Sequence, residues 1–317
     1  MLTTADLLAL HAVPGVGRAT VHRALAVCAR AELPLPSLLG ASMARLLALL
    51  PPGCAREAEA LHGCTAAHRA AARQDLAAVR QRGAQAIPFW APAYPSRLRL
   101  ALGPHAPPIL FCTGPAALLS RPCGGIVGGR RPSAQGRHLA RACALGLAPL
   151  GAAIVSGGAQ GIDREAHAAA LAASAPTIAV LPQGLLAPGP PAWLLAAARS
   201  GAALLVSEVP PFTPWQTHAA VVRNATVSAL ARVLCVLDAR KRGGSIQTAR
   251  HALSQGKPVL YGGGPSSSAL WARHTQTIRL RSGPAPEVAS QVASAWQSAE
   301  RVSLPRQSQL ELHEACA

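Results

Sequence analysis

The chain has 317 residues, half of them hydrophobic, so it can bury a sizeable core and is not a disordered protein. Its formal net charge of +17 indicates a polyanionic partner, either nucleic acid or an anionic membrane. Only two of the 30 basic residues are lysines, as expected of a GC-rich gene, and this bias is the competing explanation for the charge. It explains less well why only 13 residues are acidic.

Cysteine usage and the chain start favour a cytoplasmic protein. Eight cysteines are scattered without a CxxC pair, so we expect free thiols, no metal site and no cofactor. No charged-then-apolar leader precedes the first helical segment. Residues 168–198 carry no charged side chain, but five prolines divide them, which favours a buried strand between helices over a membrane span.

Residues 1–75 are predicted to form a small all-α domain. Leu7–Val13 and Arg18–Leu25 have helical spacing, and the Pro14–Gly17 turn between them resembles a helix-hairpin-helix of a SAM-like domain. The start of the second helix could face a phosphate, with Arg18 adding charge. An ordinary helical hairpin that binds nothing explains the same pattern, so both interpretations stay open.

Residues 76–264 are predicted to form an α/β domain, entered through a proline-containing segment at 76–124. Six short apolar runs alternate with mostly helical stretches, which is typical of a Rossmann-like, mostly parallel sheet with helices on both faces. The runs are Gly125–Gly128, Ala152–Val155, Thr177–Leu181, Ala203–Ser207, Val233–Leu237 and Pro258–Tyr261. Residues 265–317 are predicted to be an extension with one helix, Pro286–Trp296, and a polar tail.

Four segments of the α/β domain are predicted to be phosphate-binding loops at strand ends, where open α/β sheets bind ligands. Each combines residues that let a backbone approach an anion with a charged or hydrogen-bonding side chain. Their candidate residues are Gly128, Gly129 and Arg130 in the first, Ser156, Gly157, Gly158 and Gly161 in the second, Arg223 and Asn224 in the third, and Gly244 and Ser245 in the fourth. Arg131, Lys241, Arg242 and Arg18 are further candidate cations.

Two residues of the second loop region invite a different interpretation. Asp163 and His167 share a helical face and could form an acid–base pair. A carboxylate repels phosphate, however, so a helix cap or loop brace at Asp163 and a packed histidine at His167 are the favoured roles.

These segments together resemble the DNA-processing protein A (DprA/Smf) family over residues 94–264. The resemblance rests on their order along the chain: Tyr94–Leu98, Ile126–Arg130, Ser156–Asp163, Ala166–His167, Thr177–Leu181, Ser207–Glu208, Arg223–Asn224 and Gly244–Ser245. It implies a non-enzymatic single-stranded DNA-binding protein that usually forms a homodimer, protects incoming DNA and loads the RecA recombinase in natural transformation.

The chain also departs from that family. Gln160 and Ala225 stand where the family usually has arginine, and Gly129 where it has serine. No C-terminal winged-helix domain is visible after residue 264. The competing hypothesis is a nucleotide-binding sensor or nucleotide-hydrolysing enzyme with a related fold. Its expected PGGxGTxxE loop is missing around Gly262–Gly264, which leaves Glu208 and Asp163 as the carboxylates that could do such chemistry.

Overall fold

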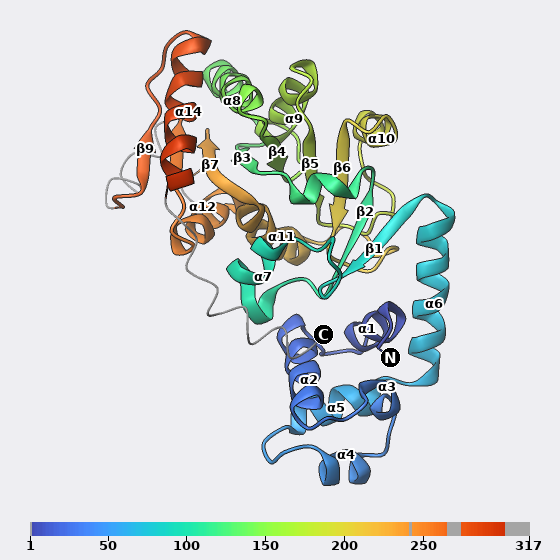
Figure 1. Cartoon of the computed structure of the whole chain (residues 1–317). Coiled ribbons are helices and arrows are strands. Elements are labelled where there is room, and N and C mark those ends of the chain that lie inside the picture. The colour runs from blue at the N-terminus through green and yellow to red at the C-terminus, as the bar shows by residue number, and fades with distance from the viewer. Residues whose placement is uncertain (1, 241–242, 265–273, 302–317) are drawn as a thin grey trace.

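The structure is a computed structural model that describes residues 2–240, 243–264 and 274–301 (Figure 1). The predicted cations Lys241 and Arg242, and the polar tail beyond 301, lie outside the described residues. Two parts follow each other along the chain: six helices, then a nine-stranded mixed sheet with helices packed on it. Within the described ranges, no helix combines the length and apolarity needed to cross a bilayer.

The N-terminal part is entirely helical, as predicted. Its helices are α1 (Thr4–His11), α2 (Arg18–Arg30), α3 (Leu35–Leu38), α4 (Met43–Leu49), α5 (Ala55–Gly63) and α6 (Ala66–Gln81). Thr3 and Asp6 form a capping box that fixes the start of α1. Gly15 has a φ of +79°, which lets the chain turn sharply between α1 and α2.

The sheet has the strand order β1-β2-β6-β5-β4-β3-β7-β8-β9. Its strands are β1 (Ala84–Pro88), β2 (Ile109–Thr113), β3 (Cys123–Gly128), β4 (Ala153–Ser156), β5 (Thr177–Leu181), β6 (Ala203–Ser207), β7 (Ala231–Leu237), β8 (Val259–Gly262) and β9 (Thr277–Arg279). Seven strands are parallel to one another, in the order β6-β5-β4-β3-β7-β8-β9. At one edge of the sheet, β2 pairs antiparallel with both β1 and β6. All six predicted strands are present.

Helices cover both faces of the sheet, as predicted (Figure 1). On one face α8 (Ala134–Leu147) and α9 (Ile162–Ala172) pack over Ile126 and Ile154. On the other, α11 (Thr217–Leu230) and α12 (Gly244–Ser254) pack over Val127 and Val155. α7 (Ser96–Leu102) contacts α11, and α10 (Ala192–Arg199) contacts β6. The alternation of side chains along each strand supplies both cores.

The sheet extends beyond the predicted strands at both edges. Residues 76–124 contribute β1 and β2, and the C-terminal segment contributes β9 and the helix α14 (Ala285–Arg301). α14 contains the predicted helix and packs against α8. Val288, Val292 and Trp296 of α14 are buried in the same core as α8 and α9, so this helix completes the covering of that face.

The prediction of a loop at residues 222–225 was wrong. Arg223 and Asn224 lie in the middle of α11, which begins at Thr217. The segment from Phe212 to Gln216, which contains Pro214 and two exposed aromatic residues, is the loop that precedes this helix. Three candidate loops at strand ends therefore remain, and they follow β3, β4 and β7. Arg223 belongs to α11 and not to a loop.

Candidate nucleic-acid interface

The loops after β4, β3 and β7 lie next to one another on one edge of the sheet. These three strands are neighbours and parallel, so their carboxyl ends meet at the same edge. The first, second and fourth segments predicted from the sequence are thus brought together.

The first and second loops are locked together through their backbones. The Ile162 N–H donates to the Gly129 carbonyl at 3.1 Å. Gly161 has a φ of +84°, and a Cβ there would collide with the Gly129 carbonyl oxygen. Only glycine permits this approach, so Gly161 is required for the contact between the two loops.

The first and fourth loops are joined in the same way. The Gly129 N–H donates to the Leu237 carbonyl at 3.0 Å, and the Ser245 hydroxyl donates to the Gly128 carbonyl at 2.8 Å. A Cβ on Gly128 would meet both the Leu237 carbonyl and Ile162. Gly128 and Ser245 therefore position the loops, and the Ser245 hydroxyl hydrogen is already engaged within the protein.

Asp238 braces this edge and was not singled out from the sequence. Its Oδ2 accepts from the N–H of Ser133 at 2.6 Å and from the Ser133 hydroxyl at 2.7 Å. Ser133 is the N-cap of α8, where its hydroxyl also accepts from the Gly136 N–H at 3.0 Å. An aspartate immediately after an apolar strand, and a serine ahead of a helix, are the two signals that could have indicated these roles.

The second loop is buried at its start and accessible in its middle. Ser156 is fully buried, and its hydroxyl donates to the Ile126 carbonyl at 2.5 Å. Gly157 is also buried, whereas Gly158 and Gly161 are partly exposed and Gln160 is exposed. The loop therefore offers backbone at Gly158–Gly161 to a ligand, while the Ser156 side chain ties β4 to β3.

Arg223 supports the second loop from beneath. It is 7% exposed and donates from Nη1 to the Val180 carbonyl at 2.7 Å. A Cβ on Gly157 would collide with this guanidinium group and would lie 2.7 Å from the Asp163 carboxylate. Asn224 donates to the Gly244 carbonyl at 3.3 Å, which links α11 to the start of α12. Both side chains thus hold the loops from the α11 side.

Asp163 and His167 occupy the structural roles favoured from the sequence. Asp163 accepts from the Ala159 N–H at 3.3 Å, which braces the loop. Burial raises the pKa of this carboxyl group, and the charge of Arg223 and the loop N–H groups oppose that shift. His167 is fully buried and hydrogen-bonds Thr177 through Nδ1 at 2.7 Å. Burial lowers the pKa of His167 to about 3.

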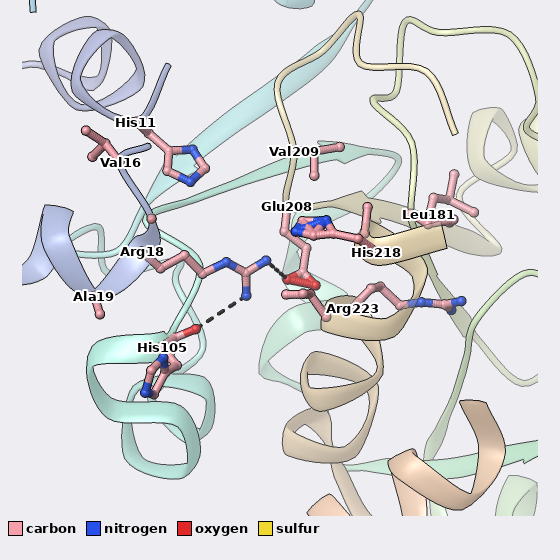
Figure 2. A pocket seen from close by; sticks show the side chains of 14 residues that line it. His11, Val16, Arg18, Ala19, His105, Leu181, Glu208, Val209, His218 and Arg223 are labelled. Carbon is pink, nitrogen blue, oxygen red and sulfur yellow. Dashed lines mark hydrogen bonds and ion pairs between the residues drawn. The ribbon is translucent and has the colours of Figure 1, made fainter. Parts of the chain in front are cut away.

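The exposed cations of this edge are arginines of the loops. Arg130 and Arg131 follow β3, and Arg240 follows β7; all three are exposed. Arg18 is placed elsewhere, at the contact between the helical part and the sheet. Its Nη2 lies 2.5 Å from Glu208 Oε2, and its Nη1 donates to the His105 carbonyl at 3.3 Å (Figure 2). Three guanidinium groups are therefore free to face a polyanion beside the glycine loops.

Comparisons with known proteins show the family of the chain. The family model of DNA recombination-mediator protein A matches residues 85–295. The DNA processing protein DprA of Bacillus subtilis is 35% identical over 214 residues, which cover 62% of this chain and 71% of the relative. The DprA of Mycobacterium tuberculosis is 40% identical over 177 residues, covering 54% of this chain. The chain spans only 45% of the length of that relative.

Two solved structures share the fold. DprA of Streptococcus pneumoniae superposes with a TM-score of 0.66 at 24% identity, covering 84% of this chain and 89% of that chain. DprA of Helicobacter pylori, described for its single-stranded DNA binding mode, has a TM-score of 0.52 at 26% identity and covers 61% of this chain and 89% of that chain. By the extent of the family match and the order of its motifs, the chain belongs to the DNA recombination-mediator protein A family.

Proposed function

We propose that this protein binds single-stranded DNA along the edge formed by the loops after β4, β3 and β7. The observation that carries the proposal is that these loops are fixed to one another before any ligand arrives, with exposed arginines beside accessible backbone. A row of such sites suits an extended phosphate chain better than a single phosphate. The single-stranded DNA binding of the H. pylori relative supports the same ligand.

Phosphates, more than bases, provide the affinity. Aromatic residues make up 3% of the chain, so long stacking platforms for bases are not expected. If about four to six phosphates are neutralised, the logarithm of the association constant falls with the logarithm of salt concentration with a slope of roughly −3 to −4. Binding is then nearly independent of sequence.

The test is a salt titration of binding to a labelled oligonucleotide, comparing the wild type with Arg130→Ala. Removing one phosphate contact should weaken binding by roughly three- to tenfold at low salt and make the slope shallower by about 0.7. Arg199→Ala is the matched control, because Arg199 is exposed and ends α10 just before β6, at the opposite edge of the sheet. A wild-type slope near zero, or equal losses in both variants, would contradict the proposal.

We further propose that the protein acts as a homodimer that protects incoming DNA and loads RecA on it during natural transformation. Family membership supports this role. Light scattering should give twice the mass of the chain. Addition of the protein should shorten the lag before RecA filaments form on DNA covered by a single-strand-binding protein. An unchanged lag would contradict the loading role while leaving DNA binding intact.

A further inference from the structure

A cavity of about 420 Å³ lies between the α1–α2 turn and the α/β part (Figure 2). The helical part contributes His11 and Val16–Ala19, and α11 contributes His218, Ala219, Val222 and Arg223. His105 comes from the turn ahead of β2, and the remaining residues lie at or just after the ends of β5 and β6. Its volume falls in the range of about 300–1,000 Å³ that small-molecule sites occupy. The loops proposed to bind DNA phosphates line none of it.

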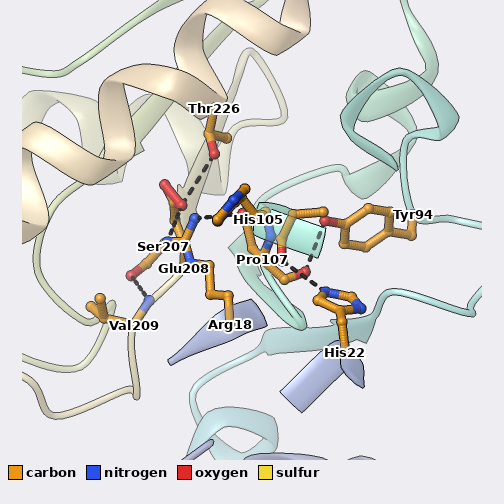
Figure 3. Close-up of polar contacts among 10 residues, drawn as sticks. Arg18, His22, Tyr94, His105, Pro107, Ser207, Glu208, Val209 and Thr226 are labelled. Carbon is orange, nitrogen blue, oxygen red and sulfur yellow. Dashed lines mark hydrogen bonds and ion pairs between the residues drawn. The ribbon is translucent and has the colours of Figure 1, made fainter. Parts of the chain in front are cut away.

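Two buried polar atoms of the cavity lining have no partner among the described residues: Glu208 Oε1 and Arg223 Nε. The Glu208 side chain is 2% exposed, and only its Oε2 is engaged, by Arg18 and by the Thr226 hydroxyl at 3.1 Å (Figure 3). A buried acceptor or donor that is left unpaired lowers the stability of the protein, because it has lost its hydrogen bonds to water. Two residues of the cavity lining therefore carry an acceptor and a donor that have no partner among the described residues.

The start of α2 provides a second recognition element. Gly17 is the N-cap, and no side chain of the described residues caps this 13-residue helix. Gly17, Arg18 and Ala19 line the cavity, so the first N–H groups of α2 are placed at its wall. A helix N-terminus attracts anions, phosphate above all. Arg18, which is held by Glu208 and the His105 carbonyl, adds a positive charge at the same place.

The rest of the wall combines apolar side chains with His11, His105 and His218. Val16, Leu181, Pro182, Val209 and Val222 surround the space between the start of α2 and α11. A mostly apolar wall with a few polar groups is typical of small-molecule sites. These features suit a ligand with three groups. An anionic group would lie at the start of α2, a ring would lie against the apolar side chains, and a hydrogen-bond donor would reach the unpaired acceptor of Glu208.

We propose that this cavity is a mononucleotide-binding site. The phosphate lies against the N-terminus of α2, and the base lies between the apolar side chains. An exocyclic amine of adenine, cytosine or guanine donates to Glu208 Oε1; thymine lacks that amine. This site is additional to the DNA-binding edge and does not depend on it. The nucleotide could be free in solution or be the 5′-terminal nucleotide of a strand, since both present a phosphomonoester.

The experiment is calorimetric titration of the full chain with each of the four deoxynucleoside monophosphates, with the nucleoside deoxyadenosine, and with inorganic phosphate. We expect the monophosphates of adenine, cytosine and guanine to bind several-fold more tightly than that of thymine. Loss of the phosphate should weaken binding by roughly tenfold or more. Inorganic phosphate alone should bind far more weakly than any of the three.

Val222→Trp is the informative variant, because Val222 lines the cavity from the exposed side of α11. Filling the mouth should weaken nucleotide binding at least tenfold. Val221→Trp is the matched control: Val221 is 41% exposed against 37% for Val222 and does not line the cavity. Its affinity should change less than twofold. Unfolding curves of both variants show whether each is folded.

Competition identifies the source of the nucleotide. Displacement by a 5′-phosphorylated oligonucleotide, and not by its 5′-hydroxyl counterpart, assigns the site to a strand end; no displacement assigns it to free nucleotides. The proposal is overturned if no monophosphate binds the wild type at millimolar concentration, or if both tryptophan variants bind equally. Wild-type binding to internal DNA segments is measured separately, so failure of this site and failure of the DNA-binding edge give different results.

Discussion

Gly161 is the residue on which the geometry of the loop edge depends most directly. Its φ of +84° and the closeness of the Gly129 carbonyl both exclude a Cβ. We expect Gly161→Ala to lower the free energy of unfolding by about 2 kcal/mol or more and to weaken DNA binding, because the first two loops must separate. Gly53 has a similar φ of +87° with open space around it, so Gly53→Ala should cost only about 1 kcal/mol. Urea unfolding measures both; equal costs would contradict the role of the close contact.

His167 should make the protein sensitive to mild acid. Thr177 donates its hydroxyl hydrogen to the Ile154 carbonyl at 2.8 Å, so the His167 Nδ1–H donates to Thr177, and Nε2 is buried without a partner. Burial lowers the pKa of this histidine to about 3 in the folded state. At a pH below the ordinary histidine pKa of about 6.5, His167 therefore binds a proton in the unfolded chain and not in the folded chain. The free energy of unfolding consequently decreases as the pH is lowered.

The expected loss from this histidine is about 2 kcal/mol between pH 7.5 and 5.0. His167→Asn keeps a donor toward Thr177 but cannot titrate, so its unfolding free energy should depend less on pH by that amount. Urea unfolding at the two pH values gives the difference. An identical pH dependence in both proteins would show that His167 is not the responsible group.

At the scale of elements, α14 is part of the α/β core. Trp296 is 3% exposed, packs in the core with α8, and has the Arg232 guanidinium 4.5 Å above its ring. Trp296→Ala should destabilise the protein by roughly 3–5 kcal/mol. Trp215, which is 50% exposed in the loop before α11, is the matched control and should cost about 0.5 kcal/mol on truncation. Comparable midpoints of thermal unfolding for the two variants would argue against a core role for α14.

The elements that could be predicted are those with continuous apolar runs. Each of the six predicted strands ends within two residues of its observed bounds, because parallel strands buried on both faces are apolar throughout. β1 carries one large apolar side chain, Ile87, and ends in Pro88. β9 lies at the sheet edge and has one apolar residue, Ile278, between two polar residues. These edge strands depend on pairing with the rest of the sheet, which no local pattern reveals.

The candidate site was predictable as a set of glycine-rich segments and not as a set of contacts. Asp238 and Ser133 are 105 residues apart in the chain, and their pairing follows only from the strand order. Arg223 was predicted to be a site residue of a loop, but its burial within α11 depends on packing against β5. Distances between loops are set by the sheet, so sequence spacing alone cannot supply them.

Among the described residues, one ion pair connects the helical part to the sheet. Arg18 is on α2 and Glu208 follows β6, and their side chains are 14% and 2% exposed. Arg18→Met leaves a buried carboxylate with only Thr226 as a partner, which should cost about 3 kcal/mol. Glu208→Gln removes the charge that needs compensation. In a double-mutant cycle, the loss of unfolding free energy in the double variant should therefore be smaller than the sum of the losses in the two single variants, by about 1–3 kcal/mol. Additive losses would show that the pair does not couple the two parts.

The carboxylate of Asp238 occupies the start of α8, where a helix dipole would otherwise attract an anion from solution. The protein thus carries its own substitute for a phosphate at one of its loops, and this carboxylate holds the loop in place from within the protein. If this edge binds DNA as proposed, binding requires little ordering of the protein and therefore little loss of conformational entropy. The association rate constant should be set by diffusion and by the long-range attraction of the +17 charge. A conformational change of the protein should not limit it.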